Sequence, residues 1–486
     1  MPHQNSCFAE KLHEECGVFG IIKTSGGCGS DPNFSREPAF DTYNALYALQ
    51  HRGQDSCGIA VLSADGHLRV HKAKGLVPEV FNKEELQKMA GASAAIGHVR
   101  HATDLTDTST SNAQPILVHR ARGSLALCYN GKLVNSRELK TEFENRGAIF
   151  QTTNDAEILT YLIVREHLRT YTLEDAVLNA MDYLVGAYSI VMMDYNCLIA
   201  VRDPNGFRPL CIGRVGDSYV FASESCAIQS LGGTFLRDVE PGEVVVVRNG
   251  QLKSFHSDIK HARGALCMFE LLYFARQDSV IDGAPISHFR DEAGRTLARQ
   301  SDTEADLVIG VPDSGIAAAM GYSRESGIPY AMGLMKNRYI QRTFIQSQNL
   351  QRQKSIRIKL NAMAAVVRGK RIVLVDDSIV RGGTMKRIVR LLREAGAKEV
   401  HVKITAPPFL YPCYYGTAIP APSQLVATGR SVEEICQIIG ADSLQYMSLS
   451  GLKTLSDKLH LHYCDACFTG RYVLPLPTGE SGTNGL

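Results

Sequence analysis

Short apolar runs separated by Gly, Asp and Asn turns fill the first half of the chain. They span residues 17–22, 58–62, 125–128, 188–193 and 243–247. Runs of this length between turn residues are typical of β-strands. We predict antiparallel strands with a few helices, one of them at residues 157–167.

The second half of the chain alternates predicted strands with predicted helices. Strands are expected at residues 306–311, 371–375 and 399–404. Such alternation indicates βαβ units and a parallel sheet. The pattern of predicted strands and helices changes near residue 255, so we expect two domains, residues 16–255 and 256–474. A polar leader (1–15) precedes them, and a short tail (475–486) of low complexity is expected to be disordered.

Composition narrows the class of protein. A chain of 486 residues is too long for one core, and 44% hydrophobic with 21% charged residues describes a soluble globular protein. A net charge of +2 gives no reason to expect nucleic acid or a membrane as partner. The leader lacks the apolar core of a secretory signal. Thirteen cysteines, an odd number, argue against a disulfide framework and favour a reducing compartment, by default the cytoplasm.

The most informative segment is Arg371-Ile-Val-Leu-Val-Asp-Asp-Ser-Ile-Val-Arg-Gly-Gly-Thr384. Its apolar run predicts a strand buried on both faces, and Asp376 and Asp377 follow where that strand should end. A small-residue turn then leads into a predicted helix, residues 385–395, and Gly396 is placed to end it. Backbone N–H groups at a helix N-terminus suit a phosphate. The turn lacks the Lys of a P-loop, which disfavours a nucleotide triphosphatase.

This segment resembles the ribose-5-phosphate loop of type I phosphoribosyltransferases. The resemblance implies that Asp376 and Asp377 bind the ribose hydroxyls of phosphoribosyl pyrophosphate (PRPP). It assigns Ser314, in the loop Val311-Pro-Asp-Ser-Gly315, to a magnesium ion together with the two aspartates. The remaining residues implied to bind PRPP lie in the phosphate loop and in a basic segment that folds over the substrate: Ser378, Arg381, Gly382, Gly383, Thr384, Lys336 and Arg342.

A cysteine, Cys16, opens the first predicted strand. Alone it would be read as a small buried hydrophobe. Four further motifs follow it at strand ends or turns: Leu49-Gln-His-Arg-Gly-Gln-Asp55, Gly97-His-Val-Arg-His-Ala-Thr103, Tyr129-Asn-Gly131 and Thr153-Asn-Asp155. Together they resemble the class II glutamine amidotransferase domain of the N-terminal nucleophile group. The implied fold is an αββα sandwich, followed in this chain by the parallel sheet of the phosphoribosyltransferase, an α/β and α+β combination.

That resemblance also assigns catalytic roles. Residues 1–15 would be a propeptide whose removal makes Cys16 the first residue. A free α-amino group has a pKa of about 7.7–8.0 and can then act as base for its own thiol. Asn130 and the N–H of Gly131 match the oxyanion hole. Arg100 matches the residue that binds the glutamine carboxylate, and Asp155 matches the one that receives its amino group.

Four other cysteines indicate a metal centre. Cys464 and Cys467 form a CxxC motif, and Cys267 and Cys413 stand alone. A pure thiolate set suits either zinc or an iron–sulfur cluster, and composition alone does not decide between them. Their sequence contexts resemble the ligand sites of a [4Fe–4S] cluster with a structural role.

The order of the two domains resembles the amidophosphoribosyltransferase family, in its iron–sulfur branch. The resemblance implies synthesis of 5-phosphoribosylamine, glutamate and pyrophosphate from glutamine and PRPP, the first committed step of purine (IMP) biosynthesis. It further implies Mg²⁺ and a [4Fe–4S] cluster as cofactors, purine nucleotides as inhibitors and a homotetramer. Two alternatives remain, a diverged paralogue with altered substrate coupling and a non-catalytic regulatory homologue. Among the positions that depart from the family pattern are Gln341, Ser347, Tyr129 and Lys132.

Overall fold

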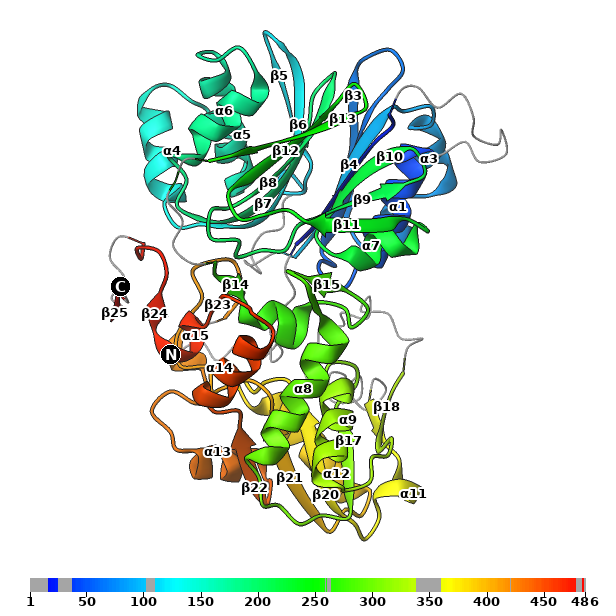
Figure 1. Cartoon of the computed structure of the whole chain (residues 1–486), viewed down its shortest axis with the longest axis vertical. Coiled ribbons are helices and arrows are strands. Elements are labelled where there is room, and N and C mark those ends of the chain that lie inside the picture. Colours follow the sequence, from blue (N-terminus) through cyan, green and yellow to red (C-terminus); the bar gives the residue numbers. More distant parts are fainter. Residues whose placement is uncertain are drawn as a thin grey trace, which may run out of the picture.

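A computed structural model of the chain describes residues 16–24, 37–101, 110–257, 259, 264–337, 360–419, 421–477 and 483–484. The expected propeptide, most of the expected tail, and the predicted or divergent positions Gln341, Arg342 and Ser347 lie outside the described residues. Figure 1 shows two β-sheets stacked face to face above a third, parallel sheet, with a small connecting region between them. Within the described ranges no helix is both long and apolar enough to cross a membrane.

The first sheet has seven antiparallel strands in the order β11-β9-β10-β1-β4-β2-β3. Their bounds are β1 Gly17–Ile22, β2 Ser56–Leu62, β3 Leu68–Lys74, β4 Ala94–Arg100, β9 Cys211–Val215, β10 Ser218–Ala222 and β11 Thr234–Asp238. The helices on this side are α1 Pro38–Ala48, α2 Val77–Val80, α3 Lys83–Lys88 and α7 Ser225–Ser230. Helices α1 and α7 pack on the outer face of the sheet (Figure 1).

The second sheet has six antiparallel strands in the order β13-β12-β8-β7-β6-β5. Their bounds are β5 Ile116–Arg120, β6 Gly123–Leu133, β7 Gly186–Met193, β8 Cys197–Arg202, β12 Glu243–Arg248 and β13 Gln251–His256. Its outer face is covered by α4 Ser136–Asn145, α5 Asp155–His167 and α6 Leu173–Met181 (Figure 1). The two sheets with their outer helices form the αββα sandwich that the sequence predicts.

Strand β1 explains why its sequence is a continuous apolar run. Val18 and Ile22 point into the core between the two sheets, whereas Phe19 and Ile21 point into the core under α1 and α7. Because successive strand residues face opposite sides, a strand between two apolar layers must be apolar throughout. The predicted strands and the helix α5 are all present.

The third sheet is parallel, in the order β17-β20-β21-β22. Its strands are β17 Leu307–Gly310, β20 Arg371–Asp376, β21 Glu399–Ile404 and β22 Ser443–Tyr446. The surrounding helices are α8 Ile286–Arg299, α9 Gly315–Ser326, α11 Ala364–Val367, α12 Gly383–Glu394, α13 Val432–Ile439 and α14 Leu449–Lys458, and a small hairpin is formed by β18 Leu334–Lys336 and β19 Leu360–Ala362. Strand β20 is central and buried, as its apolar run predicts.

Short elements connect the sandwich to the parallel sheet. Strand β14 Leu266–Cys267 pairs in parallel with β23 Tyr463–Cys464, and β14 leads into a π-helix, η2 Glu270–Phe274. The other elements of this region are the hairpin β15 Val280–Ile281 and β16 Ala284–Pro285, the 3₁₀ turn η3 Pro422–Gln424, the short helix α15 Ala466–Thr469, and the strands β24 Arg471–Tyr472 and β25 Thr483–Asn484. Segments far apart in sequence therefore meet between the two halves of the molecule (Figure 1).

Candidate active sites and cysteine pocket

Cys16 lies directly before β1, beside the end of β4. Its Sγ is 4.0 Å from the carbonyl oxygen of His101, and Gly17 is the register partner of Val99. Burial raises the pKa of the Cys16 thiol, and the positive charges of Arg100 and Arg52 oppose that increase. A thiol becomes a nucleophile only when a base removes its proton, because the thiolate is the reactive form.

The turn before β2 packs tightly against β4 at this point. A Cβ at Gly53 would lie 2.6 Å from backbone atoms of Arg100, so only glycine fits there without displacing the strand. The N–H of Asp55 donates to the carbonyl of Arg100 at 3.0 Å, and its Oδ2 lies 2.8 Å from Nδ1 of His101. The motif at residues 49–55 thus fixes the end of β4, where Arg100 is placed.

Asn130 and Gly131 lie side by side on β6. Gly131 has a φ of +148°, and a Cβ there would stand 2.0 Å from the carbonyl oxygen of Ala187 on β7. Asn130 is 1% exposed, and its Nδ2 has no hydrogen-bond partner among the residues that the structure describes. A buried donor without a partner is costly, and such groups persist where a ligand or a transition state uses them.

Asp155 is the first residue of α5. The side chain of Asn154 caps this helix by accepting from the N–H of Ala156 at 3.0 Å, and Asp155 Oδ2 accepts from the N–H of Leu133 at 3.0 Å. Burial raises the pKa of the Asp155 carboxyl. After burial, the negative charges of Asp155 and Cys16 are the largest causes that raise the pKa of Tyr129. Both groups therefore lie within electrostatic range of the same phenol.

The two predicted carboxylates of the second site come at the end of β20. Asp376 is 2% exposed and Asp377 is 3% exposed, so both carboxylates are removed from water. Ser314, which precedes α9, donates its Oγ proton to Asp377 Oδ2 at 2.5 Å. Ser378 donates in the same way to Asp377 Oδ1 at 2.5 Å. Ser314 is thus brought beside Asp377 across two neighbouring parallel strands, as the sequence predicts.

The loop after these carboxylates turns into α12. Gly382 occupies the N-cap with a φ of +83°, which favours glycine, and Gly383 is the first helical residue. The helix begins two residues earlier than the sequence predicts, because the turn ends at Gly382, whose left-handed conformation makes Gly383 the first helical residue. Arg381 Nη2 donates to Gln424 Oε1 at 2.6 Å. The N-terminal N–H groups of a twelve-residue helix therefore face the loop that the sequence assigns to a phosphate.

Lys336 stands across the same site. Its Nζ lies 2.7 Å from Asp313 Oδ2, in the loop that the sequence assigns to pyrophosphate, and both side chains are about half exposed. The ion pair brings the basic segment and this loop together. Arg342, the other basic residue predicted here, is outside the described residues.

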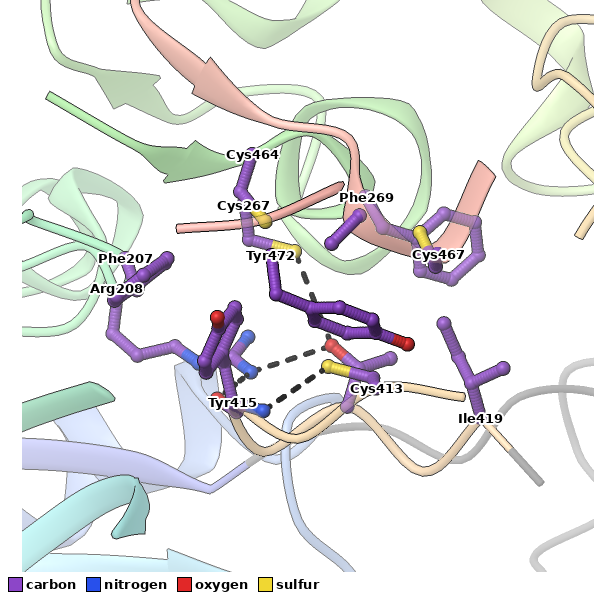
Figure 2. Close-up of a pocket in the computed structure, with 12 residues that line it drawn as sticks. Phe207, Arg208, Cys267, Phe269, Cys413, Tyr415, Ile419, Cys464, Cys467 and Tyr472 are labelled. Carbon is purple, nitrogen blue, oxygen red and sulfur yellow. Dashed lines mark hydrogen bonds between the residues drawn. The ribbon is translucent and has the colours of Figure 1, made fainter. Parts of the chain in front are cut away.

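The four cysteines predicted to form a metal centre line one pocket (Figure 2). Cys267 on β14 is the register partner of Cys464 on β23, and Cys467 follows in α15. Cys413 Sγ accepts a hydrogen bond from the N–H of Tyr415 at 3.4 Å. The rest of the lining is largely aromatic and aliphatic: Phe207, Arg208, Phe269, Tyr415, Thr417, Ile419, Ala466 and Tyr472.

Three of the four thiols of this pocket, those of Cys267, Cys464 and Cys467, have a raised pKa. Burial raises the pKa values of the Cys464 and Cys467 thiols well above the ordinary value of a cysteine. The neighbouring cysteines raise both values further. Within the described ranges, no group of three or more His, Cys, Asp or Glu residues has the geometry of a metal site. The structure thus gathers the four predicted cysteines in one pocket.

A buried chain of charged residues, which the sequence did not predict, connects the cysteine pocket with Cys16. Arg208 Nη2 donates to the carbonyl of Tyr415 at 2.5 Å and to Thr417 Oγ1 at 3.3 Å. Its Nη1 lies 3.3 Å from Glu270 Oε1, and the same oxygen accepts from Arg52 Nη2 at 2.6 Å. The one sequence signal for Glu270 is its isolation as the only charged residue in the apolar run 265–275.

Glu224 belongs to the same chain of charges. Its Oε1 accepts from Arg52 Nη1 at 2.6 Å and lies 2.7 Å from Nε2 of His51. Its Oε2 accepts from Ser279 Oγ at 2.7 Å and from the N–H of Arg276 at 2.9 Å. Burial alone would raise the pKa of Glu224, but the charges of His51 and Arg52 hold it well below its usual value. Glu224 therefore joins the sandwich to the segment after η2 as a carboxylate.

Comparison with known proteins follows the same division. The glutamine amidotransferase domain matches residues 98–230, and the phosphoribosyl transferase domain matches residues 288–406. The chain is 48% identical to an amidophosphoribosyltransferase of Bacillus subtilis, over 95% of this chain and 94% of that protein. It is 45% identical to one of Archaeoglobus fulgidus, over 96% and 99%. The solved structure of the B. subtilis glutamine phosphoribosylpyrophosphate amidotransferase complexed with ADP and GMP gives a TM-score of 0.86 at 46% identity, covering 96% of this chain and 99% of that one.

An αββα glutaminase sandwich joined to a phosphoribosyltransferase sheet defines a glutamine-dependent enzyme of the glycosyltransferase class. Identities of 45–48% over nearly the whole chain also establish the family. The chain belongs to the amidophosphoribosyltransferase family. The family and the two folds expected from the sequence are therefore confirmed.

Proposed function

We propose that this protein converts glutamine and PRPP to 5-phosphoribosylamine, glutamate and pyrophosphate, the first committed step of purine (IMP) biosynthesis. The observation that carries the proposal is the unpaired amide of Asn130, a buried donor in the same sandwich as a candidate nucleophile, Cys16. A buried donor of this kind costs stability unless a ligand or a water molecule accepts its hydrogen bond.

The glutaminase half would act after removal of residues 1–15. The α-amino group of Cys16 takes the thiol proton, and the thiolate attacks the amide carbon of glutamine. Asn130 Nδ2 and the N–H of Gly131 stabilise the oxyanion of the tetrahedral intermediate. Ammonia then leaves with the transferred proton, and water hydrolyses the thioester to glutamate. Arg100 would hold the α-carboxylate of glutamine, and Asp155 its α-ammonium group.

The second half would transfer the ribosyl group. The nitrogen of ammonia forms a bond to C1 of the ribosyl group while the bond from C1 to the pyrophosphate oxygen breaks. Asp376 and Asp377 would accept hydrogen bonds from the ribose hydroxyls. The N-terminal N–H groups of α12, with the side chains of the loop, would bind the 5-phosphate: Ser378, Arg381, Gly382, Gly383 and Thr384. Lys336 and Arg342 would neutralise the charge that develops on pyrophosphate.

Magnesium fits the oxygen atoms gathered beside Asp377. A carboxylate pair with a neighbouring hydroxyl is the kind of oxygen set that Mg²⁺ takes together with substrate phosphates. Ser314, Asp376 and Asp377 would hold it, and Ser314 already lies 2.5 Å from Asp377. When bound, the ion would supply positive charge to the pyrophosphate group.

A [4Fe–4S] cluster fits the donor set of the cysteine pocket. Its thiols come from four positions in a largely apolar lining, with no carboxylate or imidazole in that lining, and soft thiolate sets select zinc or iron–sulfur clusters. Cys267, Cys413, Cys464 and Cys467 would be the ligands. The cluster would then cross-link β14, β23 and the 413–417 segment. Iron content and visible absorbance after anaerobic purification test this. Cys413→Ser should lose both, and the matched control Cys436→Ser, outside the pocket, should keep both.

Three further properties belong to the same proposal. Purine nucleotides would inhibit the enzyme, since the relative from B. subtilis was solved with ADP and GMP. The protein would assemble as a homotetramer. It would work in the cytoplasm, where its thirteen cysteines stay reduced.

The test is glutamate release from glutamine by anaerobically purified protein, with and without PRPP and Mg²⁺. Strong stimulation by PRPP, with phosphoribosylamine detected as product, is the expected result. Cys16→Ala should lose glutamine use but keep synthesis from ammonia, whereas Cys57→Ala, a buried cysteine of β2, should keep both. Release indifferent to PRPP would favour a diverged paralogue. No turnover with either nitrogen source would favour a non-catalytic homologue.

A further inference from the structure

Arg52 holds the backbone of Cys16 from a fully buried position. Its Nε donates to the carbonyl oxygen of Cys16 at 3.2 Å, and the side chain has no exposed surface. Its two terminal nitrogens donate to Glu224 Oε1 and Glu270 Oε1, each at 2.6 Å. A guanidinium with three donors directed at three fixed acceptors has a defined orientation. The position of the Cys16 carbonyl is therefore tied to the two carboxylates.

These two carboxylates come from different halves of the chain. Glu224 precedes α7 in the sandwich, whereas Glu270 opens the π-helix η2, three residues after Cys267. A π-helical turn inside a chain is rare and occurs frequently at functional sites. The glutaminase centre is thus completed by a residue outside the sandwich.

The π-helix itself is fixed from its other end. Arg290 of α8 is 3% exposed, and it donates to three carbonyls at the end of η2, those of Leu271, Tyr273 and Ala275, at 2.7 to 2.9 Å. Glu270 also accepts from Arg208 at 3.3 Å. Contacts at both ends of a five-residue turn leave the Glu270 carboxylate little freedom to move.

We propose that Glu270 is a positioning residue of the glutaminase: it orients Arg52, and through Arg52 the backbone of Cys16. The inference rests on the proposed function, because it takes Cys16 as the nucleophile. A small misplacement of a nucleophile can cost about 10²-fold in rate although every reacting group is present. Glu270 touches neither glutamine nor the thiol, so it should affect turnover more than binding.

The test compares two variants of the enzyme, purified anaerobically after removal of residues 1–15, with a matched control. Glu270→Gln keeps the size of the side chain and removes its charge, and Glu270→Asp keeps the charge and withdraws it by one methylene. Asp282→Asn is the control, because Asp282 also makes an ion pair between the two halves, but with Arg202, whose Nη1 lies 2.7 Å from Asp282 Oδ1. For each protein, kcat and KM for glutamine are measured per titrated Cys16, beside ammonia-dependent synthesis.

We expect Glu270→Gln to lower kcat for glutamine about 10- to 100-fold with KM changed less than about threefold. Glu270→Asp should recover part of the loss. Synthesis from ammonia should stay within about twofold in both, and Asp282→Asn should leave kcat per titrated site unchanged. Because kcat is expressed per titrated Cys16, a smaller amount of folded protein alone would not lower it.

Two results would overturn the proposal. An unchanged kcat per titrated site in Glu270→Gln would leave Glu270 without influence on Cys16. A parallel fall of both activities, with a lower unfolding temperature, would make Glu270 a structural residue only. Failure of the proposed function is recognised separately, in proteins with an intact Glu270. If Cys16→Ala released glutamate as fast as the unaltered enzyme, the nucleophile itself would be wrong, and the role of Glu270 would fall with it.

Discussion

Replacing Asn130 with Leu should remove most glutamine hydrolysis without weakening the fold. Asn130 is 1% exposed, and its Nδ2 has no partner within the described part of the chain. Leaving such a donor buried and unpaired costs about 1–3 kcal/mol. Leu has the same number of side-chain heavy atoms and carries no donor, so the substitution removes that cost from the folded state. The loss of one oxyanion donor should raise the barrier by about 2.7–4 kcal/mol, which is about 10²- to 10³-fold in kcat.

The two effects have opposite signs, and three measurements separate them. Glutamate release gives kcat and KM for glutamine, ammonia-dependent synthesis reports on the second site, and calorimetry gives the unfolding temperature. For Asn130→Leu we expect a large loss of kcat, unchanged synthesis from ammonia and an unfolding temperature no lower than that of the unaltered protein.

Ser189 provides the matched control, since it is the register partner of Asn130 on β7. Its Oγ lies 3.3 and 3.4 Å from the carbonyls of Arg208 and Pro209, so this hydroxyl is satisfied. Ser189→Ala should cost about 0.5–1.5 kcal/mol of stability and leave kcat unchanged. A variant Asn130→Leu that kept kcat within about threefold, or that unfolded well below the control, would refute this account of the unpaired amide.

Three other predictions follow from the two sites. Burial raises the pKa of Asp155, so its carboxylate takes up a proton at a higher pH than an ordinary Asp does. The KM for glutamine should therefore rise as the pH falls through that raised pKa. Asp155→Asn should raise KM and abolish its dependence on pH. Asp376→Asn should abolish synthesis from both glutamine and ammonia, while basal glutamate release persists but loses its response to PRPP. Gly131→Ala would place a Cβ 2.0 Å from the carbonyl of Ala187 and should lower the unfolding temperature strongly, whereas Gly91→Ala, at a φ of +77° in open space, should cost only about 1–2 kcal/mol of backbone strain. Calorimetry distinguishes the two glycine variants.

Local pattern was sufficient to predict much of the fold and the placement of many candidate residues. The apolar run before Asp376 predicts β20, and the small-residue turn after it predicts the start of α12 to within two residues. The run 125–128 predicts part of β6, but this strand continues through Asn130 to Leu133, and the helix predicted at 157–167 begins two residues earlier, at Asp155. In each case, the chemistry lies within a few residues of the element that positions it, so sequence and structure carry the same information.

Pairings between distant residues could not be predicted in this way. Arg52 belongs to the motif at residues 49–55, but nothing in its neighbourhood indicates that Glu270, in the other half of the chain, accepts its hydrogen bond. Such a contact depends on how two domains dock, which local propensity does not encode. The apolar run around Glu270 only indicates that this charge must be buried, and a buried charge requires some partner.

The parallel pairing of β14 with β23 also sets an order of events during synthesis. Cys267 emerges from the ribosome long before Cys464 and Cys467, and its strand has no register partner until they follow. The last strand of the glutaminase sandwich, β13, ends at His256, so that half can fold while the remainder of the chain is still being translated. The cysteine pocket is therefore among the last parts of the protein to be completed. The four thiols can come together only after translation has passed Cys467, and a prematurely terminated chain would carry a folded glutaminase sandwich without the four-thiol pocket.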